Sequence, residues 1–286
     1  MSLTTIANKM RTDKGTQTGA AHGYSLVYDM LFAALRDRSS IDLLEMGLAI
    51  GGPELGGNID RNVTASPSVN MWLEYFPQAH VTGFDISDFS AIRHDRFTFL
   101  RGDSGKREDV QRIRALGRQY DIILDDAAHA SYHQQLGLAV LFDCLKPGGL
   151  YIIEDLGWQP ASIEAALPAV PTTAQVLVEF LATGRLPPTA AIAVAEAERL
   201  EKMISAVQLL DESQLNALGD TYNRTRGLPS VHRPGWRGQG AGGRVFSPYF
   251  WLYSARRFAQ GLTGRESANW QSVKLAILQR APDAQD

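Results

Sequence analysis

Four residues suited to acid–base or metal chemistry lie close together in the stretch 120–156. Asp126 and His129 follow one short apolar run, and Glu154 and Asp155 follow a second. Short apolar runs that end in turn signals predict buried parallel strands, whose carboxyl ends meet at one edge of the sheet. Carboxylates suit a hard divalent cation, and an imidazole beside them suits a general base. We therefore predict a metal-and-base site there, although strand-end acids that cap helices or face solvent remain an alternative.

A second group of acids, earlier in the chain, is typical of a nucleotide-type cofactor site. Glu45 precedes Gly47 and a glycine-rich turn, and Asp85 and Asp103 end the next two predicted strands. Such acids accept hydrogen bonds from ribose hydroxyls or from an adenine amino group. A dinucleotide and S-adenosylmethionine both fit this pattern. No GxGxxG turn follows the first strand, so no cradle for a pyrophosphate is predicted, and S-adenosylmethionine is favoured.

Alternating apolar strands and amphipathic helices position both groups of residues. This order predicts an α/β fold, a Rossmann-like doubly wound and mostly parallel sheet. The predicted strands are 41–46, 80–86, 97–100, 120–124, 150–154, 205–210 and 272–279. The predicted helices are 25–36, 69–76, 108–116, 131–145, 172–182 and 189–203, with a turn at 146–149, a short helix or loop at 211–219 and an exposed loop at 220–244.

Length and composition exclude several classes of protein. The 286 residues suffice for one large α/β domain with additions or for two small domains, and the net charge of −3 gives no drive toward nucleic acid or anionic membranes. Cys144 is the only cysteine, so no disulfide forms within the chain and a reducing compartment is expected. No signal peptide or membrane-spanning run is apparent. We expect a cytoplasmic protein without a membrane partner.

Several motifs in residues 12–156 occur together, in one order, in a known family. They include Thr12-Asp13-Lys14-Gly15, His22-Gly23-Tyr24, LLEMG, GGPELGG, MWLEYFPQAHVTGFDISD, RGDS, DDAAH and IIEDL. The chain resembles class I S-adenosylmethionine-dependent methyltransferases and, more narrowly, the metal-dependent sugar O-methyltransferases of macrolide antibiotic biosynthesis. The motifs cover about half of the chain, and only as a set are they specific.

The resemblance implies the cofactors and the residues that hold them. Mg²⁺ would be bound by Asp126, Glu154 and Asp155, with His129 as the general base. S-adenosylmethionine would be bound by a set that includes the upstream acids and glycine: Glu45, Gly47, Asp85, Ser87, Asp103, Asp125 and Tyr24. The expected acceptor is a small hydroxylated molecule, such as a sugar of a glycosylated natural product, and a dimer or tetramer is expected.

The expected organisation is an N-terminal lid and helix over 1–40, followed by a methyltransferase domain over 41–286. This domain carries insertions around 159–204 and 211–270, and a glycine-rich loop at 235–244 is a candidate lid. Because residues 157–271 match no family pattern, a polyketide or phenolic diol also remains open as acceptor. An NAD(P)-dependent oxidoreductase and a non-catalytic methyltransferase-like subunit are the competing classes, since this architecture hosts many chemistries.

Overall fold

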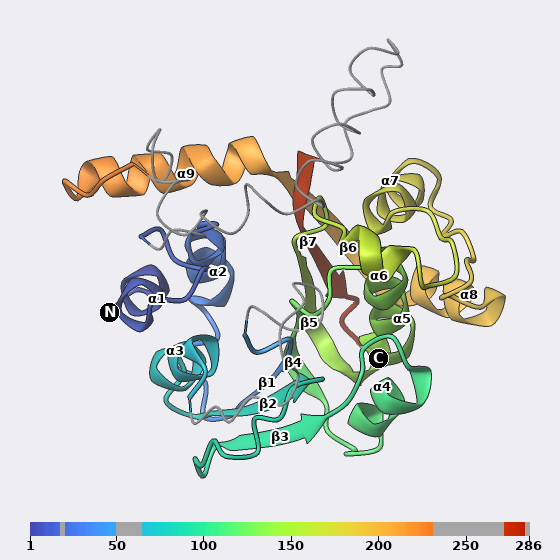
Figure 1. The fold of residues 1–286 in the computed structure, drawn as a ribbon, viewed down its shortest axis with the longest axis horizontal. Coiled ribbons are helices and arrows are strands. Elements are labelled where there is room, and N and C mark those ends of the chain that lie inside the picture. The colour runs from blue at the N-terminus through green and yellow to red at the C-terminus, as the bar shows by residue number, and fades with distance from the viewer. Residues whose placement is uncertain (18–20, 50–64, 231–271, 284–286) are drawn as a thin grey trace.

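The computed structural model describes residues 1–17, 21–49, 65–230 and 272–283. Seven strands of these residues form one sheet in the order β3-β2-β1-β4-β5-β7-β6 (Figure 1). Their bounds are Ile41–Met46 for β1, Ala79–Asp85 for β2, Phe97–Arg101 for β3, Tyr120–Asp125 for β4, Leu145–Glu154 for β5, Ile204–Asp211 for β6 and Val273–Arg280 for β7. Pairing from β3 through β5 is parallel, whereas β7 runs antiparallel to β5 and β6. The predicted doubly wound, mostly parallel sheet is confirmed.

Helices cover both faces of the sheet, so the central strands are buried on both sides. On one face pack α1 (Leu3–Met10), α2 (Tyr24–Phe32) and α3 (Pro67–Tyr75). On the other pack α4 (Arg107–Arg114), α5 (Ser131–Leu141), α7 (Thr173–Thr183) and α8 (Val194–Met203), with the one-turn α6 (Ala161–Glu164) nearby (Figure 1). The last helix, α9 (Glu212–Thr225), contacts α2 and β6 and extends from the sheet over the N-terminal segment.

Local sequence signals explain where several helices begin. The Ser66 side chain accepts a hydrogen bond from the amide of Val69, and Pro67 occupies the first turn of α3, as is usual at a helix N-terminus. Asp211 caps α9 in the same way by accepting from the amide of Gln214. These caps place α3 behind the carboxyl end of β1 and join α9 directly to β6.

The structure corrects some predicted boundaries. The turn predicted at 146–149 is wrong: Leu145 already pairs with Tyr120, and the register then shifts so that pairing resumes at Leu150. The Lys-Pro-Gly-Gly segment is thus an irregularity within β5. Helix α1 was not predicted, and α9 extends through residues 220–225, which were predicted as loop. The helix predicted at 189–203 begins only at Val194, and the one predicted at 131–145 ends at Leu141, followed by one 3-10 turn over 142–144.

Two of the expected features cannot be compared with the structure. Most of the glycine-rich turn after Gly47 and the glycine-rich segment 235–244 lie outside the described residues. Within the described part of the chain, no helix is both long and apolar enough to cross a membrane.

Candidate active site

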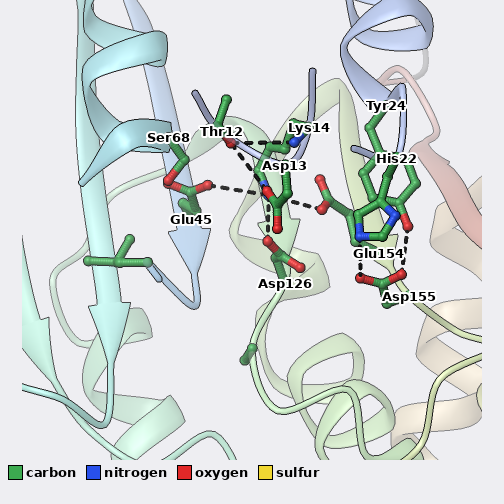
Figure 2. A network of polar contacts seen from close by, with 12 residues as sticks. Thr12, Asp13, Lys14, His22, Tyr24, Glu45, Ser68, Asp126, Glu154 and Asp155 are labelled. Atoms are coloured by element: carbon green, nitrogen blue, oxygen red, sulfur yellow. Dashed lines mark hydrogen bonds and ion pairs between the residues drawn. The ribbon is translucent and has the colours of Figure 1, made fainter. Parts of the chain in front are cut away.

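Acidic side chains from three adjacent strands meet at the carboxyl edge of the sheet (Figure 2). Glu45 lies near the end of β1, Asp126 directly follows β4, and Glu154 and Asp155 end and follow β5. Parallel pairing of β1 with β4 and of β4 with β5 brings these strand ends together. The sheet edge where open α/β folds bind ligands is therefore lined with carboxylates.

Gly47 allows the ends of β1 and β4 to approach each other. Its φ of 83° is in the left-handed region, and a Cβ there would lie 2.1 Å from the carbonyl oxygen of Asp126. The amide of Asp126 donates to the carbonyl of Met46 (2.8 Å), which fixes this close contact. Gly47 is needed for packing against the Asp126 backbone, whether or not a cofactor also approaches it.

Lys14, from the segment between α1 and α2, inserts its ammonium group among the acids. Its Nζ donates to Asp126 Oδ2 and to Glu154 Oε2 (2.9 Å) and lies 3.9 Å from Glu45 Oε1. The Lys14 side chain is 1% exposed. A buried ammonium requires such partners, so Lys14 and the acids stabilise one another.

Two tyrosines of α2 hold the acids that end β5. The Tyr28 hydroxyl donates to Glu154 Oε1 (2.6 Å), and the Tyr24 hydroxyl donates to Asp155 Oδ1 (2.9 Å). Lys274 Nζ of β7 lies 3.3 Å from the same oxygen of Asp155. Both oxygens of Glu154 are thus occupied by Tyr28 and Lys14. Tyr24, predicted in the cofactor site, lies against the predicted metal site.

His129 and Asp155 both adopt left-handed backbone conformations, with φ values of 58° and 54°. Such values are uncommon outside glycine and concentrate at functional sites. One ligand atom from each of Asp126, His129 and Asp155 lies within 4.8 Å of the others. The His129 ring packs against Trp158 at a centroid distance of 5.0 Å, so this tryptophan borders the site.

The charges of the cluster perturb the pKa values of its members. Burial raises the pKa of Glu45 to about 7, although the Lys14 charge and the Ser68 hydrogen bond oppose this. Burial also raises the pKa values of Asp126 and Glu154, and Lys14 counteracts the rise in both. For Asp155, burial acts in the raising direction, but His22, His129 and Lys274 outweigh it and hold the pKa well below its usual range. Asp155 is the carboxylate best maintained in its charged form.

The predicted cofactor acids have distinct surroundings. Asp85 accepts backbone amides on both oxygens, from Leu48 (2.7 Å) and Ser87 (2.7 Å), and so shapes the turn after β1. Asp103 accepts from the amide of Gly105 (2.9 Å). Asp125 is buried beneath the edge, where its carboxyl faces Gly137 of α5, and burial raises its pKa to about 7.

The donor set fits a hard divalent cation. Mg²⁺ is usually held by one or two carboxylates and keeps several waters, and Asp126 and Asp155 supply two carboxylates near each other. Within the described residues, Nδ1 of His129 is buried and has no hydrogen-bond partner. An imidazole is a poor ligand for Mg²⁺ compared with oxygen, so the group suits His129 as a base beside the ion.

Three curated proteins show what the chain is similar to. Mycinamicin VI 2''-O-methyltransferase of Micromonospora griseorubida is 34% identical over 141 residues, which cover 48% of this chain and 32% of that protein. 8-demethyl-8-(2-methoxy-alpha-L-rhamnosyl)-tetracenomycin-C 3'-O-methyltransferase of Streptomyces olivaceus is 33% identical over 141 residues, covering 48% and 33%. L-olivosyl-oleandolide 3-O-methyltransferase of Streptomyces antibioticus is 30% identical over 156 residues, covering 54% and 36%.

The chain resembles sugar O-methyltransferases. It spans about a third of the length of the curated relatives that it matches. No family model matches the chain.

Solved structures agree on the fold. The MycE methyltransferase from the mycinamycin biosynthetic pathway, in complex with Mg and SAH, superposes with a TM-score of 0.56 at 23% identity, covering 73% of this chain and 52% of that chain. The same enzyme with Mg, SAH and mycinamycin VI gives 0.54 at 24% identity, covering 73% and 52%. The sheet order and these superpositions identify the Rossmann-like fold of class I methyltransferases.

Sequence reasoning missed three residues that touch the acids. Lys14 stood in the Thr-Asp-Lys-Gly motif without an assigned role, Tyr28 lay in a predicted helix, and Lys274 lay in a predicted strand. His133, four residues after His129, does not share a helical face with it, because α5 begins only at Ser131. His133 instead interacts with Ser104 Oγ (3.0 Å). The motif around Lys14 was the only signal available from the sequence.

Proposed function

We propose that this protein is an S-adenosylmethionine- and Mg²⁺-dependent O-methyltransferase that methylates a sugar hydroxyl of a glycosylated natural product. The observation that carries the proposal is the convergence of Asp126, His129 and Asp155 at the carboxyl edge of the sheet. The similarity to sugar O-methyltransferases, and the Mg and SAH bound by MycE, support the choice of cofactors and acceptor. A methyltransferase of a polyketide or phenolic diol uses the same chemistry and differs in acceptor.

The mechanism follows from the chemistry of the donor groups. Asp126 and Asp155 would hold the metal ion, with Glu154 as the third carboxylate that the resemblance implies. The chemistry that bound Mg²⁺ would supply is Lewis-acid polarisation, which would lower the pKa of the acceptor hydroxyl. His129 would accept the hydroxyl proton, and the backbone after β4 holds the imidazole at the edge of the site. Trp158 shields the imidazole on one side, and placement of the acceptor oxygen in line with the methyl group supplies the remaining rate enhancement.

The N-terminal segment belongs to the proposed site. His22 Nε2 lies 3.9 Å from Asp155 Oδ2, and burial lowers the pKa of His22 despite that carboxylate. An imidazole at this position can hydrogen-bond to an acceptor hydroxyl. His22 and Lys14 are therefore proposed to border the bound acceptor, at the place predicted for the N-terminal lid.

The test uses the full chain with rhamnosylated and other glycosylated polyketides and their aglycones as acceptors. We expect a methylated product, detected by mass spectrometry, from a glycoside with S-adenosylmethionine and Mg²⁺, and none after EDTA treatment. Thermal-shift measurements with S-adenosylmethionine, S-adenosylhomocysteine and NAD(P), with and without Mg²⁺, test cofactor class independently of the acceptor. Stabilisation by NAD(P) alone would favour an oxidoreductase. Full activity in EDTA would disprove the metal requirement.

The dimer or tetramer implied by the family resemblance is also part of the proposal. Light scattering after gel filtration measures the mass in solution. A mass equal to one 31.4 kDa chain would contradict it.

A further inference from the structure

Lys14 combines a fixed backbone with a side chain that has more than one acidic partner. Its carbonyl accepts from the amide of Ser25 (2.8 Å), and the adjacent Gly15 carbonyl accepts from the amide of Gly23 (2.9 Å). Thr16 is held on both sides, because its amide donates to Asn8 Oδ1 (2.7 Å) and its carbonyl accepts from the buried Asn223 of α9 (3.1 Å). The main chain around Lys14 is therefore anchored, so only rotation about its four side-chain torsions can redirect the ammonium group.

Glu45 offers the Lys14 ammonium group a second position. One of its oxygens, Oε2, accepts from Ser68 Oγ (2.8 Å). The other, Oε1, is buried, and no donor of the described residues makes a hydrogen bond of good geometry to it, although the Trp72 indole is close enough to Glu45 to help lower its pKa. Lys14 Nζ lies 3.9 Å from this oxygen, about 1 Å beyond a normal charge-assisted hydrogen bond. A small rotation of the side chain would complete that contact.

We infer that Lys14 is a two-position cation, which neutralises Asp126 and Glu154 in the metal-free protein and transfers to Glu45 when a divalent cation takes those carboxylates. The inference rests on the proposed function. It assigns to Lys14 a positioning role that couples the metal site to the acid at the end of β1.

The physical reason is the competition of two cations for the same buried oxygens. The Lys14 ammonium and a metal ion repel each other at short range, and both need Asp126 and Glu154. An unpaired ammonium in this water-excluded place would be strongly unfavourable. Among the described residues, Glu45 is the nearby acid whose Oε1 has no hydrogen bond of good geometry and already lies 3.9 Å from Lys14 Nζ, so it receives the charge.

The consequence is reciprocal coupling between two halves of the site. Glu45 lies in the strand–turn unit proposed to bind S-adenosylmethionine, so metal binding would alter the charge beside the cofactor. By linkage, any ligand that favours the Lys14–Glu45 contact would strengthen metal binding by the same factor.

A double-mutant cycle on Mn²⁺ affinity, followed by electron paramagnetic resonance, tests the inference. In the native Lys14 background, Glu45→Gln should weaken Mn²⁺ binding by roughly tenfold, because the displaced ammonium loses its second partner. In the Lys14→Met background, Glu45→Gln should change the affinity by less than about twofold. Lys14→Gln provides a second neutral variant if Lys14→Met folds poorly, as judged by circular dichroism and thermal unfolding.

The control is Lys274→Met, which also removes a lysine charge beside the acids, at Asp155. In that background the roughly tenfold effect of Glu45→Gln should persist. Equal effects of Glu45→Gln with and without Lys14 would overturn the inference while leaving the metal site intact. Absence of Mn²⁺ binding by the unmodified protein would instead disprove the proposed function, and the inference with it.

A measurement on the unmodified side chain complements the cycle. The ¹⁵Nζ resonance of Lys14 should shift when diamagnetic Mg²⁺ is added, and the shift should differ in Glu45→Gln. A Lys14 resonance unchanged by saturating Mg²⁺ would also overturn the inference.

Discussion

At the amino ends of β1, β4 and β5, Asp42 and Asp121 pair with Lys146, Arg38 and Arg118. At the carboxyl ends of the same strands, the balance of charge is reversed. There, the carboxylates of Glu45, Asp126, Glu154 and Asp155 face two lysines, Lys14 and Lys274. Asp13 adds a further negative charge.

The two ends also differ in access to water. The cations at the amino end are exposed by 33% or more, whereas Lys14 is 1% exposed. Ion pairs with exposed cations, like those at the amino end, contribute about 0–1 kcal/mol each to the stability of the fold. A buried excess of carboxylates opposes folding unless a ligand or a cation completes it. The comparison separates charged groups that stabilise the sheet from those proposed to bind a metal ion.

The largest expected difference between the two ends comes from removing one carboxylate at each. Asp126→Asn should reduce methyl transfer by roughly a thousandfold, because it removes a proposed ligand of the metal ion that would stabilise transition-state charge. Asp121→Asn, at the amino end, should lower the unfolding temperature and leave turnover within about twofold. Steady-state kinetics at saturating Mg²⁺ measures the turnover of both variants, and thermal unfolding measures their stability. Comparable losses of turnover would remove the distinction between the two ends.

Replacement of His129 tests the proposed chemical role of the carboxyl end directly. His129→Ala should slow the chemical step by roughly 10²–10⁴-fold, the usual contribution of a general base. Single-turnover measurements with Mn²⁺ affinity in parallel distinguish a base from a ligand. Unchanged turnover would exclude the base role, and loss of Mn²⁺ binding would indicate that His129 is a ligand.

A smaller effect on kcat is expected from removing a tyrosine hydroxyl that orients one of the acids. Tyr24→Phe removes the donor to Asp155 and should reduce kcat by about tenfold, the equivalent of one hydrogen bond to a charged group. Tyr75→Phe removes an analogous donor to Asp29, away from the site, and is the matched control. Equal kcat values for the two variants would show that the Tyr24 hydroxyl does not orient Asp155 for catalysis.

At the amino end, Lys146→Met should affect stability alone. Lys146 Nζ contacts Asp121 Oδ2 (2.7 Å) and Asp42 Oδ2 (3.0 Å), so its loss should lower the free energy of unfolding by about 1 kcal/mol. Urea denaturation measures this value, and Lys9→Met, which breaks one exposed pair with Glu74, should change it less. A loss of activity below the unfolding temperature would contradict the structural role.

The smallest expected effect is on the pH dependence of stability and comes from His133. This residue lies near the functional edge, but we assign it a structural role. Burial lowers its pKa below the usual value, so the unfolded chain binds a proton more readily than the folded chain. Its contribution to stability should therefore be present above about pH 6.5 and be lost as pH falls below that value. Unfolding at pH 8 and pH 5.5 should show a smaller pH dependence for His133→Gln than for the unmodified protein. An identical pH dependence of unfolding in the two proteins would show that His133 does not contribute to it.

Much of the fold could be predicted because its signals are local. Apolar runs marked most strands nearly to the residue, and the acids after them indicated which sheet edge carries the chemistry. The irregularity in β5 was not predicted because Pro147 and Gly148 favour a turn, whereas pairing of the residues on either side, Leu145 with β4 and Leu150 with β4 and β7, keeps the strand in the sheet. Helix α9 also extends farther than its weak pattern indicated, and it contacts α2 and β6.

The sequence by itself determined the types and order of the acids at the ends of the strands, because strand periodicity and turn residues act over a few positions. Tertiary structure alone decided what faces those acids. Lys14 lies far from Glu154 in the chain, yet it reaches that carboxylate because α2 and α9 anchor its segment over the sheet edge. Such pairings depend on burial and on long-range packing, which no local pattern encodes. The structure thus turned an acidic edge into a buried cluster with its own internal cation.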